Sequence, residues 1–60
     1  MKENTLTLIN KAISESDLLF VNGTLVKPYS VEGDHLFYHD ISIGKDEVCS
    51  LQFAEVESYE

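Results

Sequence analysis

The stretch GDHLFYHD, residues 33–40, contains both histidines of the chain, His35 and His39, and each has an aspartate beside it. Imidazole and carboxylate groups bind zinc and transfer protons, so this stretch is the first candidate for chemistry. A spacing of four residues places both histidines on one face of a helix, where they could share a metal ion. In a strand the same spacing separates their Cα atoms by about 13 Å, at roughly 3.3 Å per residue, which is too far for one zinc ion.

The residue types around the histidines favour an extended chain. Gly33 precedes them, two aromatic residues lie between them, and Ile41 and Ile43 follow. Aromatic and β-branched residues are typical of strands. The sequence therefore predicts a strand over residues 35–43 with no metal site of its own, and it places the two histidines at polar strand edges.

Other catalytic arrangements have even less support. Cys49, His39 and Asp40 could supply a nucleophile, a base and an orienting acid, but no signature spacing connects them. The adjacent carboxylates Asp46 and Glu47 fall in a predicted turn, where water keeps both ionised. We therefore expect neither an enzyme nor a cofactor. Cys49 is the only cysteine, and we expect a buried free thiol, with a reactive thiol or an intermolecular disulfide as the alternatives.

The chain is strongly acidic. It has eleven Asp and Glu residues against four Lys and Arg residues, and its net charge is −7 over 60 residues. This charge repels phosphate backbones and anionic lipids, so we expect no direct binding to nucleic acid or to membranes. It suits a basic protein partner, although it could serve only to keep the protein soluble. No segment has a signal-peptide core or the ~20 apolar residues of a membrane span, which predicts a cytoplasmic protein.

The first regular element is a predicted helix that starts near Thr5 and ends near Glu15. Leu6, Ile9 and Ile13 recur at the spacing of one helix face. The polar run after Ile13 competes with the helix backbone and ends it. A helix of about three turns is not stable alone, so it needs a sheet to pack against.

That sheet is indicated by LLFVNGTLVK, residues 18–27. Asn22 and Gly23 suit the positive φ angles of a two-residue type I′ turn, so the sequence predicts a β-hairpin. The expected pairs are Val21 with Thr24, Phe20 with Leu25, Leu19 with Val26, and Leu18 with Lys27. Both faces of this hairpin are then apolar.

After the hairpin, Pro28 is expected to end the second strand because it has no amide hydrogen for a ladder. Residues 28–34 would form a loop, and the strand over 35–43 would follow. A turn over 44–47 would lead to a fourth strand over 48–53. Residues 54–60 could continue that strand or form a helical turn. The predicted fold class is α+β: one domain over residues 1–60, with an N-terminal helix packed on a four-stranded antiparallel meander.

One short helix can cover only one face of the hairpin, which leaves an apolar face without a partner unless the C-terminal segment covers it. We therefore expect a small acidic protein-binding module, an inhibitor or regulator of a larger protein, that uses an apolar strand face rimmed by carboxylates. Two alternatives are a decoy that mimics nucleic acid in a basic groove and a purely structural homodimerisation domain. The expected contact residues are Leu18, Phe20, Leu25, Tyr29, Asp34, Tyr38 and Asp40.

Overall fold

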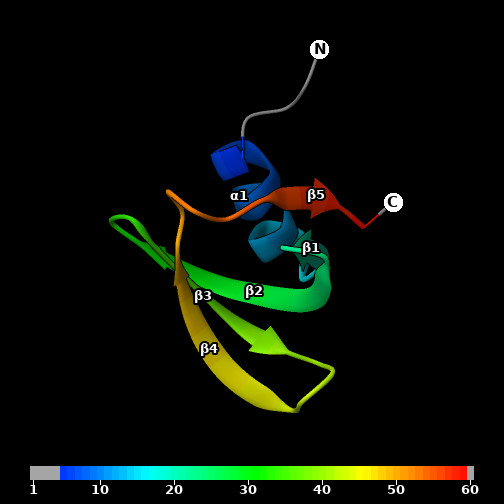
Figure 1. Ribbon diagram of the computed structural model, residues 1–60. Helices are drawn as coiled ribbons and strands as arrows, with labels where there is room; N and C mark the ends of the chain where they lie inside the picture. The colour runs from blue at the N-terminus through cyan, green and yellow to red at the C-terminus, as the bar shows by residue number, and fades with distance from the viewer. Residues whose placement is uncertain (1–4, 60) are drawn as a thin grey trace.

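The computed structural model describes residues 5–59, which form one helix and one antiparallel sheet (Figure 1). The elements are α1 (Thr5–Glu15), β1 (Leu19–Val21), β2 (Thr24–Glu32), β3 (His35–Asp40), β4 (Lys45–Ser50) and β5 (Val56–Ser58). The strand order is β4-β3-β2-β1-β5. Helix α1 contacts β2 and β5. The α+β class is confirmed, but the sheet has five strands, not four.

Helix α1 buries one stripe and ends where the sequence predicts. Ile9 and Ala12 are 0% and 2% exposed, whereas Asn10 and Lys11 face solvent. At its C-terminus, the Ser16 amide donates to the Ile13 carbonyl at 3.3 Å, and the Asp17 amide donates to the Ala12 carbonyl at 2.8 Å. Ser16 has a φ of 53°. These are the two bonds of a Schellman motif, which satisfies the last carbonyls of the helix.

The β1–β2 hairpin has the predicted turn and register. Asn22 and Gly23 have φ values of 52° and 83°, as a type I′ turn requires. The pairs are Leu19 with Val26, Phe20 with Leu25 and Val21 with Thr24. Leu18 precedes β1 and takes no part in this register. Pairing therefore stops one residue short of the prediction.

The prediction that Pro28 ends the second strand is wrong, and residues 28–32 belong to β2 rather than to a loop. The backbone N–H and C=O groups of successive residues point to opposite neighbouring strands. The backbone groups of Val26 and Pro28 therefore both point towards β1. Because β1 begins at Leu19, the partner of Val26, no β1 residue lies opposite Pro28. The missing amide hydrogen therefore costs no ladder bond. A bulge between Pro28 and Ser30 follows at once.

The boundaries of the third and fourth strands also differ from the prediction. β3 ends at Asp40, residues 41–44 form the turn, and β4 begins at Lys45. The Asp40 carboxylate accepts hydrogen bonds from the Ser42 amide at 3.0 Å and from the Ser42 hydroxyl at 2.6 Å. The Gly44 amide donates to the Asp40 carbonyl at 2.8 Å. These local bonds divert the chain from the ladder, so the isoleucines of the turn do not extend the strand.

The C-terminal segment crosses to the far edge of the sheet. Residues 51–53 form a turn, and β5 then pairs with β1. Asn22 and Glu55 join the two segments twice: the Asn22 amide donates to the Glu55 carbonyl, and the Glu55 amide donates to Asn22 Oδ1, both at 2.8 Å. Leu51, Ala54 and Val56 pack against the core. The crossing therefore lies on the side of the sheet that α1 covers.

The core lies between α1 and one face of the sheet. Its buried apolar residues are Ile9, Ala12, Leu19, Val21, Val26 and Leu36. Within residues 5–59 no helix is long and apolar enough to cross a membrane.

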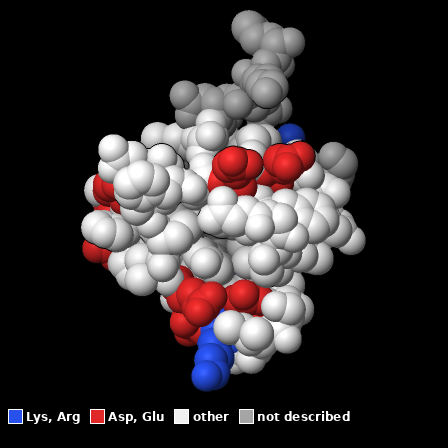
Figure 2. All heavy atoms as spheres, viewed as in Figure 1, with Lys and Arg blue, Asp and Glu red and all other residues white. Residues whose placement is uncertain are grey.

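Charge is spread over the outside of this core. In the view of Figure 2, the carboxylates form separate groups, and uncharged residues occupy most of the surface between them. Among residues 5–59, Asp40 is the one buried charged residue, and it is 8% exposed.

Candidate protein-binding surface

The sheet has two unlike faces. Alternation along the strands puts the core residues on the side of α1, and the pairing registers place a second set on the other side. We call this second side the open face, and its residues are Phe20, Leu25, Lys27, Ser30, Glu32, His35, Phe37, His39, Asp46, Val48, Ser50 and Glu57. None of these twelve residues is buried.

Apolar residues form two directly paired groups on the open face. Phe20 lies opposite Leu25, and Phe37 lies opposite Val48. Val48 is 52% exposed. The Tyr59 ring lies beside Phe20, with 6.1 Å between the ring centroids and an interplanar angle of 37°. Cross-strand pairs of this kind stabilise the sheet, and neither α1 nor the segment after β4 packs over them, because both pack on the core side.

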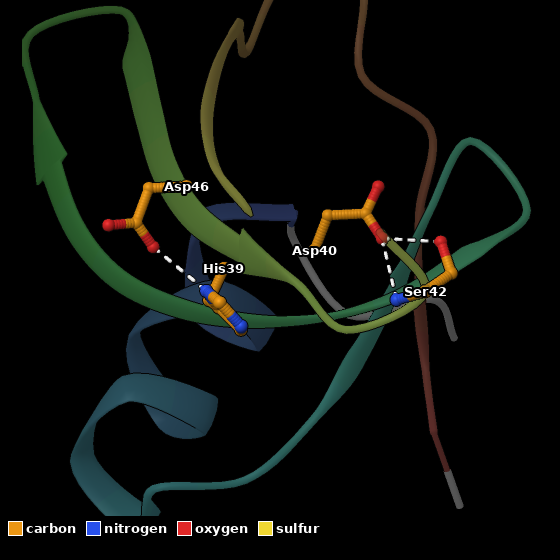
Figure 3. Close-up of polar contacts among 4 residues, drawn as sticks. All are labelled: His39, Asp40, Ser42 and Asp46. Carbon is orange, nitrogen blue, oxygen red and sulfur yellow. Dashed lines mark hydrogen bonds and ion pairs between the residues drawn. The ribbon is translucent and has the colours of Figure 1, made fainter. Parts of the chain in front are cut away.

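A polar row separates these two groups. Lys27 on β2 lies opposite His39 on β3, and His39 lies opposite Asp46 on β4. His39 Nδ1 and Asp46 Oδ1 are 2.9 Å apart and share a hydrogen bond (Figure 3). The two side chains are 44% and 68% exposed. An exposed pair of this kind contributes little to stability, so the fold does not depend on this row.

The structure brings together two of the expected contact residues, Phe20 and Leu25. Tyr29 lies in β2 at the bulge and is 50% exposed. Leu18 instead lines a groove of about 200 Å³ between α1, β1 and β5. That volume is below the roughly 300–1,000 Å³ of ordinary ligand pockets. Tyr38 packs on the core side.

Two groups on the core side have shifted acidities. The pKa of Tyr38 is raised, chiefly by burial and then by the charges of Cys49, Glu47 and Asp40. Burial alone raises the pKa of the Cys49 thiol. Both effects favour the neutral form. A thiol with a raised pKa is a weaker nucleophile at neutral pH than an ordinary cysteine.

The two expected contact aspartates take part in turns. Asp34 Oδ2 accepts a hydrogen bond from the Ser50 hydroxyl at 2.6 Å, and the Asp34 carbonyl accepts one from the Leu51 amide at 2.7 Å. Asp40 holds the β3–β4 turn through Ser42 (Figure 3). Asp34 remains exposed, whereas Asp40 offers little surface to a partner.

The histidines lie on one strand, as expected. His35 and His39 are four residues apart on β3, paired with Ser50 and Asp46 respectively on β4. Residues 5–59 contain no group of three or more His, Cys, Asp or Glu side chains that could hold a metal ion.

The sequence prediction did not assign several residues to the contact surface. Val48 and the polar row were not assigned to the contact surface, because the fourth strand was expected to start at Val48 rather than at Lys45. Ile41 and Ile43 are 48% and 54% exposed in the β3–β4 turn, and Phe53 is 77% exposed in the turn after β4. Extending the hairpin register across β3 is the signal that could have found Phe37 and His39.

No protein-family model, curated protein or solved structure shows significant similarity to the chain. The functional assignment therefore rests on the geometry described above.

Proposed function

We propose that the protein is a small acidic protein-binding module that contacts its partner through the open face. One observation carries the proposal. Helix α1 and the crossing segment after β4 both pack on the core side, so neither covers Phe20, Leu25, Phe37 or Val48, and the one ring contact on this face is that of Tyr59 with Phe20 among residues 5–59. Apolar sheet surface of this kind is typical of contact sites between proteins.

The side chains of the open face suit such a contact. Aromatic residues carry much of the binding energy at interfaces, and Phe20, Phe37 and Tyr59 supply them here. Asp46 and Glu57 add carboxylates beside the apolar groups. Together with the net charge of −7, they favour a partner with a basic surface and speed its approach. A small module acts as a regulator or inhibitor when the surface it covers on a larger protein is a functional one. A lone cysteine suits the reducing cytoplasm, where we propose that the protein acts.

A decoy that mimics nucleic acid has less support. A decoy needs a continuous array of free carboxylates spaced like phosphates. Asp40 is 8% exposed, Asp34 accepts a bond from Ser50, and Asp46 shares one with His39. The remaining carboxylates lie in separate groups in the view of Figure 2. The apolar open face therefore supports partner binding better than the charges support mimicry.

The proposal is tested by capture from an extract of the native host with immobilised protein. The test variant is Phe20→Asp on the open face, and the matched control is Phe53→Asp, which makes the same change at a residue that is 77% exposed in the turn after β4, outside the strands of that face. Circular dichroism first establishes that both variants fold.

We expect one protein to be captured by the wild type and by the control but not by Phe20→Asp. Repeating the capture at high salt separates a mainly electrostatic contact, which weakens, from an apolar one, which persists. Equal capture by all three proteins, or no specific capture by the wild type, would contradict the proposal.

A further inference from the structure

We infer that a second copy of this chain covers the part of the open face formed by β2, β3 and β4, in a face-to-face dimer whose two-fold axis runs along β3 over His39. This inference rests on the proposed function, because it takes the open face to be a protein contact. It assigns the β2–β4 part of that face to a second copy and leaves Phe20 on β1 for the basic partner. Its basis is the order of charges in the polar row Lys27–His39–Asp46.

The polar row is incomplete within one chain. Lys27 lies opposite His39, which offers it no negative charge. On the other side of β2, no β1 residue is paired with Lys27. Lys27 forms no ion pair within residues 5–59, where His39 with Asp46 is the sole pair. Asp46 uses Oδ1 for His39, which leaves its Oδ2 available. One end of the row therefore has an unpaired cation, and the other end has a carboxylate oxygen to spare.

A two-fold axis along β3 gives both Lys27 and Asp46, at the two ends of the polar row, a partner of opposite charge. Adjacent strands are about 4.8 Å apart, so Lys27 on β2 and Asp46 on β4 lie at equal distances on either side of His39. Rotation about the axis exchanges the positions of β2 and β4. Lys27 of each copy then lies over Asp46 of the other, which gives two identical pairs in an isologous interface. An axis perpendicular to the strands would instead place Lys27 over Lys27.

The same axis accounts for apolar residues on both sides of the row. Phe37 lies on β3, two residues from His39, and meets its own counterpart across the axis. Leu25 lies one row beyond Lys27 on the other side, and it meets the turn of the second copy that carries Ile41 and Ile43. These isoleucines are 48% and 54% exposed in the single chain. The interface thus has apolar contacts on either side of a paired polar row.

The size and charge of the chain are compatible with this dimer. A standard interface covers about 800 Å² on each partner. The described surface is 4213 Å², so one sheet face must supply about a fifth of it. Each copy carries a net charge of −7, but repulsion between charges farther apart than about 8 Å is largely screened at physiological salt. The two Lys27–Asp46 pairs act at contact distance, where screening is weaker.

The test is a reciprocal charge exchange followed by sedimentation equilibrium at protein concentrations up to about 1 mM, which reaches Kd values at the weak end of specific association. We expect the wild type to reach twice its 6.8 kDa mass. Lys27→Asp alone and Asp46→Lys alone should each weaken the dimer about tenfold or more, because each replaces two attractive pairs with two repulsive ones. An equimolar mixture of the two variants should dimerise again, since each of the two contact sites in the mixed dimer holds one lysine and one aspartate.

The matched controls are Lys11→Asp and Glu15→Lys on the exposed surface of α1. They make the same changes in the sign of the charge at their positions and should leave the dimer unchanged.

Two results would overturn the inference. A wild type that stays monomeric throughout the concentration range excludes the dimer. Single variants that dimerise as tightly as the wild type place the contact elsewhere, for example at the sheet edges β4 or β5. In either case, capture of another protein that depends on Phe20 would leave the proposed function intact, so the two failures are distinguishable.

Discussion

The difference between the two sheet faces predicts unequal costs for the same substitution at two leucines. Leu36 on β3 is 0% exposed in the core, whereas Leu25 on β2 is half-buried on the open face. Leu36→Ala should cost about 3 kcal/mol, because it removes buried apolar surface and leaves a cavity. Leu25→Ala should cost about 1 kcal/mol, since little packs against it in the monomer.

These costs are large compared with the stability of so short a chain. At roughly 0.05–0.15 kcal/mol per residue, a domain of this size has about 3 to 9 kcal/mol in total. Each kcal/mol shifts the Tm by roughly 4 to 8 °C. We therefore expect a fall of roughly 15 °C for Leu36→Ala and roughly 5 °C for Leu25→Ala.

The assay is urea unfolding and thermal melting followed by circular dichroism at about 5 µM protein, where self-association adds little to apparent stability. Equal losses at the two positions would refute the assignment of the core to the α1 side. A larger loss at Leu25 would show that a second layer covers the open face in the monomer, and the proposed contact surface would then be lost.

Three further predictions concern the turns and the thiol. Asp40→Ala should cost about 2 kcal/mol because Ser42 loses its acceptor, and Asp40→Asn, which keeps an oxygen, should cost about half as much in urea unfolding; a cost near zero would show that the turn does not depend on this carboxylate. Asn22→Ala should speed hydrogen exchange of the β5 amides, because alanine is strained at this positive φ and cannot accept the hydrogen bond from the Glu55 amide. Asn22→Gly loses only that side-chain hydrogen bond and should have a smaller effect. Unchanged exchange in both variants would contradict this prediction. Burial raises the pKa of Cys49 above its ordinary 9.0, so the unfolded chain loses this proton at lower pH than the folded chain does. Stability contributed by the neutral thiol is therefore present below pH 9 and lost as the pH rises through the folded value, and between about pH 8 and pH 10 the wild type should lose more stability than Cys49→Ala; parallel losses would argue that the thiol is not shielded.

Local sequence was enough to predict the helix and the first hairpin. The ends of α1 follow from apolar spacing and from polar residues that compete with its last turn. The register of β1 and β2 follows from Asn22-Gly23, because a two-residue turn permits one pairing. These features depend on residues close together in the chain, so no knowledge of the remaining fold was needed.

Boundaries in the middle of the chain depend on distant partners. Pro28 is compatible with β2 only because β1 begins at Leu19, opposite Val26, so no β1 residue needs a hydrogen bond from position 28. The end of β3 depends on hydrogen bonds that Asp40 makes through its side chain, and Asp40 has the same local sequence signal as any aspartate near a strand end. Neither condition can be read from a window of neighbouring residues.

Spacing and turn chemistry act locally, and for that reason an acidic α+β chain, a short amphipathic helix and a hairpin with two apolar faces could all be predicted from the order of residues. The path of the crossing segment after β4 could not, because it is set by packing: Leu51, Ala54 and Val56 are partly buried against the core. That packing carries the segment along the core side to β5, beside β1, so the segment does not cover the open face. Folding also aligns Lys27, His39 and Asp46 across three strands, a juxtaposition that exists only once the registers of β2, β3 and β4 are set.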